Sequence, residues 1–348
     1  MEGEISNFVV VWITILLSLC YCHAIAKFMP KGTLRVLLVL PIVYLFFYLP
    51  LNLTTIHLGG VTAFFIAWLA NFKLLLFAFN KGPLCSDPPM PLSRFVPMAC
   101  LPIQDIKSKE SLEKPLKSSL NYATKLMLLV VFVKVYDYNE HLHQGIKLLL
   151  YCLHIYFSLE VLLAMFAYLA RAVIRVELEP QFNEPHLATS LQDFWGKRWN
   201  LTVSSILRPT VYEPVRSASS RVMGRKWTPL PAVFATFLVS GVMHELIFYY
   251  IGRVKPTGAA TCFFLLHGMC LGAEIAMKKV LNGRFVLPPA VSRPLALGFV
   301  LVTSFWLFFP PFMKNKPDVK GCTETMAFIE FVMNRRLVSP IHLTCPFL

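Results

Sequence analysis

The sequence predicts an all-α polytopic membrane protein with about eight transmembrane helices, forming a single membrane domain over residues 1–348. The first observation is composition: 56% of the 348 residues are hydrophobic and 15% are charged, against roughly 25% charged in soluble domains. The second is that apolar windows of about 20 residues, the length that crosses a ~30 Å hydrocarbon core, recur along the chain. The third is that Lys and Arg gather in alternate connections between these windows, as in proteins that cross the membrane repeatedly.

Eight apolar segments account for the predicted helices, and no internal repeat or soluble domain separates them. The first is expected to stay in the mature chain, because Glu2 and Glu4 precede it and it is longer than a signal-peptide core. The fourth is the weakest, because Lys125 and Lys134 lie within or beside it. The predicted spans are residues 8–26, 34–53, 60–80, 120–136, 146–170, 229–251, 257–277 and 293–312.

The distribution of positive charge predicts the orientation of the chain. The formal net charge is +14, and the basic residues favour the first, third, fifth and seventh connections. Because basic connections stay in the cytosol, we expect the N-terminus on the opposite side. The basic tail would then share that side, a conflict that one missed or re-entrant segment would remove; its basic residues are Lys314, Lys316, Lys320, Arg335 and Arg336.

Residues 81–119 have the composition of a loop, with seven prolines and the basic stretch Lys107-Ser108-Lys109. Proline prevents a regular spanning helix here. We expect a cytosolic loop that contacts anionic lipid headgroups.

The nine cysteines show no CxxC or Cys/His spacing typical of zinc sites. Most lie in apolar spans, where cysteine packs as a small hydrophobic residue. We therefore expect neither a metal site nor a disulfide framework.

Residues 171–251 are the predicted catalytic core segment, a basic loop followed by a histidine-bearing span. Trp195, Trp199, Val203 and Leu207 recur every four residues, so a helix over 193–208 would present one apolar face. Such a helix would lie at the membrane interface with its basic side chains facing phosphates. Those phosphates could belong to lipids or to a cofactor such as coenzyme A.

His244 lies inside the sixth apolar span, where an ionisable residue indicates function. A neutral imidazole there can act as a general base, and the alternative is a structural histidine bonded across helices. Glu245 points about 100° away around the helix, so we expect a packing role for it. Three other histidines are rivals for the catalytic role: His57, His154 and His267.

Two motifs resemble those of the membrane-bound O-acyltransferases: Phe194-Trp195-Gly196-Lys197-Arg198-Trp199-Asn200 and Ser240-Gly241-Val242-Met243-His244-Glu245. The chain length and two N-terminal stretches are similar to the plant wax synthases of that superfamily, which are long-chain-alcohol O-fatty-acyltransferases; the stretches are His57-Leu58-Gly59-Gly60 and Trp68-Leu69-Ala70-Asn71-Phe72-Lys73.

The resemblance implies a reaction chamber inside the membrane, with His244 as the catalytic histidine and Asn200 as its partner across the chamber. It places Trp195 and Trp199 in the acyl-CoA segment. Arriving from the cytosol, acyl-CoA would meet Lys197, Arg198 and Arg208 with its phosphates. The implied co-substrates are acyl-CoA and a fatty alcohol, with no metal or other cofactor, in the endoplasmic reticulum.

Several functions remain open at this stage. The first is wax-ester formation from acyl-CoA and a long-chain alcohol, and the second keeps the reaction but uses a sterol or diacylglycerol. A transporter with His244 and Glu245 as a proton relay should show inverted repeats or broken helices, and the sequence shows neither. An inactive binding scaffold is the last, and nucleic acid is excluded because the positive charge is spread over membrane flanks. The oligomeric state is not indicated.

Overall fold

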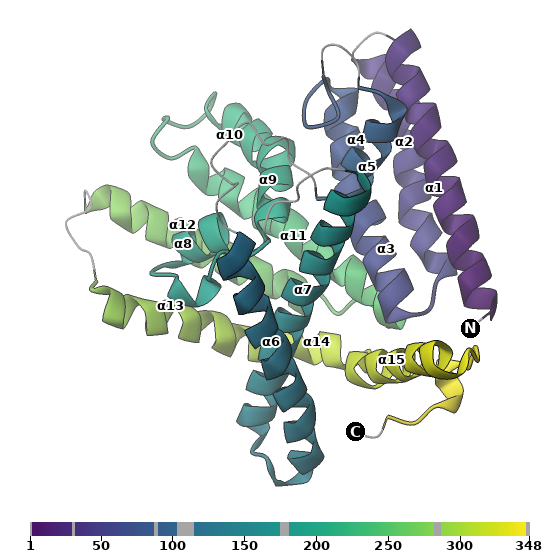
Figure 1. The fold of residues 1–348 in the computed structure, drawn as a ribbon. Helices are drawn as coiled ribbons and strands as arrows, with labels where there is room; N and C mark the ends of the chain where they lie inside the picture. The colour runs from purple at the N-terminus through teal and green to yellow at the C-terminus, as the bar shows by residue number, and fades with distance from the viewer. Residues whose placement is uncertain are drawn as a thin grey trace.

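The computed structural model describes residues 2–29, 32–86, 90–102, 115–174, 181–281 and 287–345, and every regular element in these ranges is helical (Figure 1). This confirms the all-α prediction. Seven helical stretches are long and apolar enough to cross a membrane: Gly3–Phe28, Thr33–Asn52, Ile56–Ala78, Gln144–Met165, Pro229–Gly252, Ala259–Val280 and Pro289–Met313. Each overlaps a predicted span.

The remaining predicted span, 120–136, falls on α6 (Pro115–Val135), whose apolar part is only Tyr122–Phe132. Helix α6 packs against α7 (Gln144–Ile174), and Lys125 of α6 forms an ion pair with Glu160 of α7 at 2.7 Å. The lysine that weakens this span therefore has a carboxylate partner on the neighbouring helix, as a charge at membrane depth requires.

The N-terminal third forms a bundle of α1 (Glu2–Phe28), α2 (Thr33–Tyr48), α4 (Asn71–Ala78) and α5 (Leu92–Cys100). Its third span begins with the wide turns η2 (Ile56–Gly60) and η3 (Phe64–Ala70), which flank α3 (Val61–Ala63). Ile15, Phe46 and Leu74 pack in its core. Val10 and Leu17 of α1 are 59% and 66% exposed, as expected of a lipid-facing surface.

The predicted loop 81–119 contains α5, which the sequence did not suggest. The buried Lys73 of α4 donates to the Met98 and Leu101 carbonyls and so fastens the end of α5 to the bundle. Residues 87–89 and 103–114, including Lys107 and Lys109, lie outside the described residues.

The C-terminal half contains two long helices packed side by side, α11 (Pro229–Gly252) and α12 (Ala259–Val280). They are followed by α13 (Pro289–Thr303), η9 (Ser304–Phe308), α14 (Phe309–Met313) and α15 (Pro317–Asn334). Short helices precede them: η6 (Pro185–Leu187), α8 (Leu191–Asp193), η7 (Phe194–Arg198), α9 (Leu201–Leu207), η8 (Arg208–Tyr212) and α10 (Glu213–Ser219).

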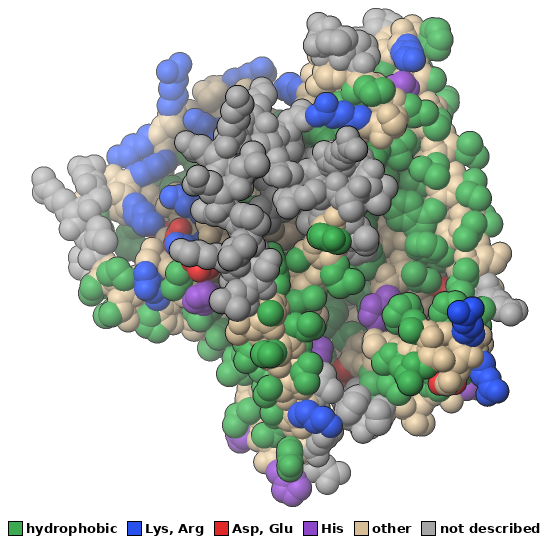
Figure 2. Space-filling model, viewed as in Figure 1, with side chains coloured by type: hydrophobic (Ala, Val, Ile, Leu, Met, Phe, Trp, Pro, Cys, Tyr) green, Lys and Arg blue, Asp and Glu red, His purple; other side chains and the backbone are tan. Residues whose placement is uncertain are grey.

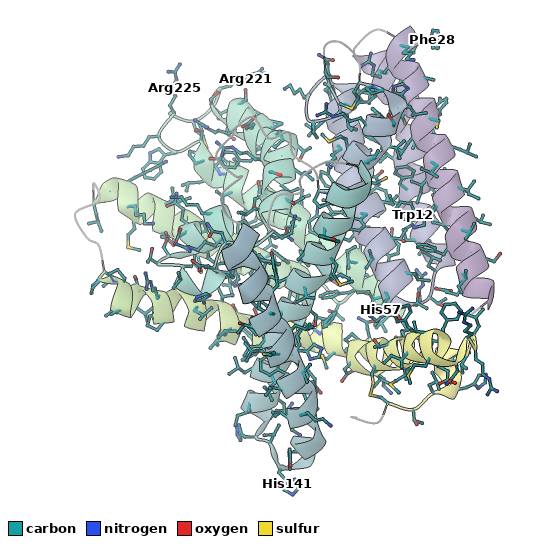
Figure 3. All side chains as sticks on the ribbon, in the orientation of Figure 1. Trp12, Phe28, His57, His141, Arg221 and Arg225 are labelled. Carbon is teal, nitrogen blue, oxygen red and sulfur yellow. A yellow bond between two sulfur atoms is a disulfide. The ribbon has the colours of Figure 1, made fainter. Side chains whose placement is uncertain are left out.

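The connections separate onto two faces of the molecule. In Figure 3, Phe28, Arg221 and Arg225 mark one end, and His57 and His141 mark the other. We call the first end the basic face, where Lys and Arg side chains gather over α10 (Figure 2). The second is the N-terminal face, which contains residues 52–57, 136–143 and 253–258, the N-terminus and α15 (Figure 1). The alternation agrees with the predicted topology.

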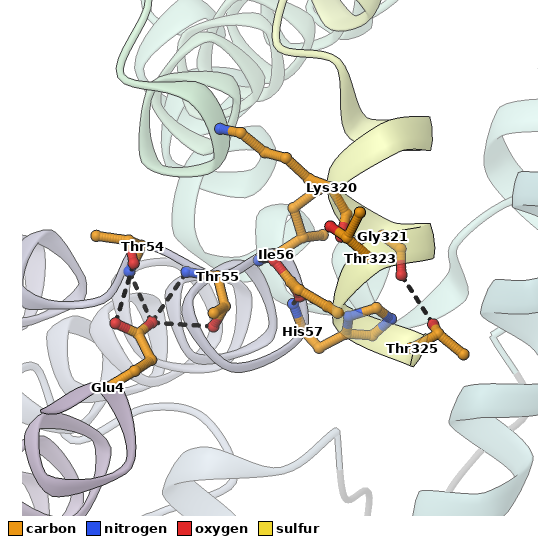
Figure 4. A network of polar contacts seen from close by, with 10 residues as sticks. Glu4, Thr54, Thr55, Ile56, His57, Lys320, Gly321, Thr323 and Thr325 are labelled. Atoms are coloured by element: carbon orange, nitrogen blue, oxygen red, sulfur yellow. Dashed lines mark hydrogen bonds and ion pairs between the residues drawn. The ribbon is translucent and has the colours of Figure 1, made fainter. Parts of the chain in front are cut away.

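On the N-terminal face, two carboxylates link α1 and α15 to the start of the third span, and Figure 4 shows the contacts of the first, Glu4. Glu4 of α1 accepts hydrogen bonds from the backbone and hydroxyl groups of Thr54 and Thr55 at 2.8–3.0 Å. Glu324 of α15 accepts from the Ile56 and His57 backbone and from His57 Nδ1. The first backbone N–H groups of a helix have no partner within the helix, so they bind negatively charged groups favourably. Glu4 and Glu324 supply such groups and hold the start of the third span from α1 and α15.

A disulfide joins Cys322 of α15 to Cys345, so the expectation that the cysteines would form no disulfide was wrong for this pair. The other seven form no disulfide within the described residues, and five of them lie in predicted apolar spans: Cys20, Cys22, Cys152, Cys262 and Cys270. Disulfides persist in oxidising compartments, which supports a non-cytosolic N-terminal face.

The predicted continuous helix over 193–208 was also wrong. Trp199 is extended, with φ −103° and ψ 125°. Asn200 is left-handed, with φ 43° and ψ 64°. The chain therefore turns between η7 and α9, and the two tryptophans face different surroundings.

Candidate active site

His244 lies near the middle of α11, and its ring is oriented by its own helix. Its Nδ1 lies 2.7 Å from the Ser240 carbonyl oxygen, one turn earlier. Because a carbonyl only accepts, Nδ1 carries the proton and Nε2 keeps its lone pair. No residue in the described ranges bonds to Nε2. The backbone thus selects the tautomer that a general base needs.

Aromatic rings from four elements surround this imidazole. The Trp68 ring of η3 meets it edge-on, with ring centroids 5.2 Å apart. Phe264 of α12 lies 4.4 Å away and Phe308 of η9 lies 5.6 Å away. Phe248 of α11 is 6.4 Å away. These rings make an apolar enclosure in which a polar reaction step is shielded from water.

Trp68 is 2% exposed, and its Nε1–H has no hydrogen-bond acceptor among the described residues. An unpaired buried donor costs roughly 1–3 kcal/mol. Beside a candidate base, such a donor is available to a substrate oxygen. In the sequence, Trp68 stands within a stretch that resembles the wax synthases, and that resemblance implies no role for it.

Asn200 begins α9, and its Oδ1 accepts from the Val203 backbone N–H at 3.3 Å. Its Nδ2 makes no hydrogen bond within the described chain. Val203 and Leu207 of α9 pack with Trp68 and with Met243, the neighbour of His244. The asparagine and the histidine therefore stand on elements that meet in one apolar cluster.

Trp195 of η7 packs against a second cluster, which contains Phe237, Phe263 and Phe264. Its ring contacts Phe264 at 5.8 Å, and its Nε1 donates to His267 Nδ1 at 3.1 Å. His267 Nε2 in turn lies 2.8 Å from the hydroxyl of Thr303, which donates to a carbonyl of α13. Both nitrogens of His267 are thus occupied, which makes it a structural histidine joining η7, α12 and α13.

The basic residues between Lys197 and Arg208 differ in how many hydrogen bonds and ion pairs they make. Arg198 donates to Asp193 at 2.8 Å and to the Asn183 and Glu184 carbonyls. Burial opposes ionisation of Asp193. The hydrogen bonds from Arg198 and Thr189 and the charges of Arg198 and Lys197 outweigh it, so the Asp193 pKa lies below its ordinary value.

Lys197 is exposed and has no ion pair in the described chain, and Arg208 is 71% exposed with only a 3.5 Å contact to Glu213. Trp199 stacks on Phe194 at 5.4 Å and on Tyr156 of α7 at 6.1 Å. Lys197 and Arg208 are therefore exposed and largely unengaged, whereas Arg198 and Trp199 hold the segment together.

The carboxylates near the histidines serve other partners. Glu245 accepts from the Ala260 and Thr261 backbone N–H groups and caps α12, which confirms its packing role. Glu160 pairs with Lys125, and Glu274 accepts from Leu191 N and from Lys278. Among the described residues, Glu160 makes no hydrogen bond to His154, and Glu274 makes none to His267.

The two remaining rivals are also engaged elsewhere. His57 pairs with Glu324 at 2.6 Å on the N-terminal face. His154 stacks on Tyr136, whose hydroxyl lies 3.4 Å from its Nδ1. Of the four candidate histidines, His244 alone combines a backbone-selected tautomer with an aromatic enclosure.

Comparison with known proteins gives one family. Residues 178–266 match the model of the membrane bound O-acyl transferase family. The chain is 47% identical over 337 residues to acyl-CoA–sterol O-acyltransferase 1 of Arabidopsis thaliana, covering 95% of this chain and 97% of that protein.

Two further relatives are named for long-chain alcohols. The long-chain-alcohol O-fatty-acyltransferase of Simmondsia chinensis is 42% identical over 344 residues, covering 96% and 97% of the two chains. The probable long-chain-alcohol O-fatty-acyltransferase 9 of Arabidopsis thaliana is 43% identical over 340 residues, covering 96% and 99%.

Proposed function

Because this chain belongs to the membrane-bound O-acyltransferase family, we propose that it transfers a long-chain acyl group from acyl-CoA to the hydroxyl of a long-chain alcohol, forming a wax ester. The observation that carries the proposal is the enclosed imidazole of His244, with Nδ1 held by Ser240 and Nε2 free. Both substrates are apolar over most of their length, which suits a site at membrane depth.

His244 acts as the general base of the proposed reaction. Its Nε2 removes the proton from the alcohol hydroxyl while the oxygen attacks the thioester carbonyl carbon. The carbon–sulfur bond then breaks, and the CoA thiolate takes the proton back from His244. No covalent enzyme intermediate is needed, since a thiolate is a good leaving group.

Two donors are available for the oxyanion that forms on the carbonyl oxygen. Asn200 Nδ2 is free while its Oδ1 caps α9, and Trp68 Nε1–H is buried and unpaired beside His244. Losing an oxyanion donor typically lowers the rate about 10²–10³-fold. Asn200 thus combines a structural cap with a proposed catalytic donor.

We further propose that CoA approaches from the basic face, in the endoplasmic reticulum membrane. Lys197 and Arg208 are the exposed cations of the segment. Arg198 is committed to Asp193, so its contribution would be to position the segment. Trp195 and Trp199 shape the wall beside the acyl chain in this proposal.

A sterol is the second candidate acceptor, because the relative named for sterols is 47% identical while two named for long-chain alcohols are 42% and 43% identical. The enclosure is made of rings rather than of polar side chains, and both acceptors present an isolated hydroxyl on an apolar body.

Product analysis separates these acceptors. Microsomes from cells that lack neutral-lipid synthesis receive labelled palmitoyl-CoA with hexadecanol, a sterol or diacylglycerol, alone and in competition. A labelled wax ester as the main product supports the proposal. If a sterol ester or triacylglycerol is the main product, the acceptor is a sterol or diacylglycerol instead. If no acceptor yields an ester, the proposed reaction is wrong.

A further inference from the structure

We propose that the N-terminal bundle contains a second binding site, a basic pocket that holds the phosphate of an anionic lipid headgroup. The cavity has a volume of about 510 Å³ and lies between α1, α2, α4 and the turn that leads to α5. Its basic lining residues are His23, Lys27, Arg35 and Lys81. We call it the α1–α4 pocket.

Charged side chains of one sign predominate among the described residues that line this pocket. No carboxylate occurs among the described residues that line it. Like charges that share one cavity repel each other, and a low-dielectric wall strengthens their field, so an anion is favoured there. Lys27 and Lys81 are exposed at its rim. Figure 2 shows Lys or Arg and His side chains on the surface at this end of the molecule.

Arg35 provides the second observation. Its side chain is 5% exposed, and its Nε–H has no acceptor among the described residues. One guanidinium nitrogen donates to the Met29 and Ala26 carbonyls at the end of α1, and the guanidinium lies over the Phe77 ring at 5.3 Å. These contacts fix its position without supplying a negative charge, and buried charges ordinarily have an ionic partner.

The depth of the pocket indicates its ligand. His23 and Lys27 lie in the last two turns of the first span, and Lys81 follows the third span by three residues. Span ends lie level with lipid phosphates, where clusters of basic residues recognise anionic headgroups. Guanidinium and ammonium groups together suit a phosphate monoester, which carries several acceptor oxygens.

This pocket is separate from the chamber around His244. The aromatic enclosure is built from η3, α11, α12 and η9, and none of its rings lines the α1–α4 pocket. Phosphate binding here therefore does not depend on the proposed acyl transfer. The phosphates of free CoA share the same chemistry, so the test must distinguish a lipid from CoA.

The test measures binding of fluorescent phosphatidic acid to the purified full-length chain in detergent, with unlabelled phosphatidic acid, phosphatidylcholine and CoA as competitors. The main variant is the double substitution Lys27→Gln/Lys81→Gln, because both side chains are exposed and can change without disturbing the core. Arg221→Gln removes one exposed charge elsewhere on the basic face and is the matched control. A thermal unfolding curve checks that each variant is folded.

We expect the double variant to bind phosphatidic acid about thirtyfold more weakly, since each basic side chain near an anionic surface contributes roughly fivefold, and Arg221→Gln to bind as the wild type does. If excess CoA displaces the fluorescent lipid from the wild type but not from the double variant, the phosphate site stands and its ligand is CoA. Equal binding by wild type and double variant would overturn the proposal, as would displacement by phosphatidylcholine as effective as by phosphatidic acid.

Discussion

Gly241 controls how closely α12 approaches α11, the helix that carries His244, and adding one methyl group there tests whether that distance matters. A Cβ at Gly241 would lie 2.8 Å from the Thr261 Cα and 3.3 Å from the Phe264 Cβ. Carbon atoms pack comfortably at about 3.5–4.0 Å. The Gly241→Ala substitution must therefore move α12 by about 1 Å, and small residues at such crossings allow this close packing of membrane helices.

The displacement acts on stability and on rate. Overpacking typically costs about 1–3 kcal/mol, which exceeds the gain of up to about 1 kcal/mol from replacing a helical glycine by alanine. Phe264 lies against His244, with ring centroids 4.4 Å apart, so the enclosure moves with α12. A misplacement of about 1 Å can lower the rate about 10²-fold.

Gly272 is the matched control on the same pair of helices, because a Cβ there would meet only Leu230 Cδ2 at 3.9 Å. The assay is thermal unfolding in detergent together with ester formation per folded protein. Gly272→Ala should be neutral or slightly stabilising and fully active. If Gly241→Ala matches Gly272→Ala in both measurements, the reasoning about close packing beside His244 is wrong.

Three further predictions follow from the site and its supports. Asn200→Ala loses the α9 cap and must adopt the left-handed backbone, so it should destabilise the fold by about 2 kcal/mol. Asn200→Gly avoids the backbone strain, because glycine adopts the left-handed conformation readily. A 10²–10³-fold loss of ester formation in folded Asn200→Gly would identify a catalytic amide. Full activity would leave Trp68 as the donor, to be tested with Trp68→Phe. Because the folded-state pKa of Asp193 is lowered, its ion pair with Arg198 stabilises the fold above the ordinary carboxyl pKa, and this stabilisation is lost as the pH falls through the folded-state pKa. The difference in melting temperature between wild type and Asp193→Asn should therefore persist at pH 5–7 and shrink below about pH 4. A pH-independent difference would contradict the ion-pair assignment. In sealed microsomes, Cys345 of Cys322→Ser should react with an impermeant maleimide only after the vesicles are opened, and labelling of Cys345 in intact vesicles, measured against Cys322→Ser/Cys345→Ser, would reverse the assigned topology.

The spans could be predicted because they depend on local composition. Lys125 correctly marked the weakest span, but its partner Glu160 lies on another helix, 35 residues away. Such pairing is set by packing between helices and leaves no local pattern. The same holds for the enclosure of His244, since Trp68, Phe264 and Phe308 come from three different spans.

Two errors had signals that could have been used. Asn200 is a strong N-cap residue, and its Oδ1 caps α9, so the four-residue apolar period should have been divided there. Cys322 and Cys345 lie outside the predicted spans in one polar tail. Packing within an apolar span therefore could not account for these two cysteines.

The most direct test of the account is ester formation by His244→Gln compared with wild type, at equal amounts of folded protein, with palmitoyl-CoA and whichever acceptor the wild type prefers. Glutamine keeps much of the volume and polarity of histidine but cannot act as a base at neutral pH. General-base catalysis contributes about 10²–10⁴-fold, so we expect the variant to retain less than about one hundredth of the wild-type rate. A variant rate within about tenfold of wild type would contradict the assignment of His244 as the base.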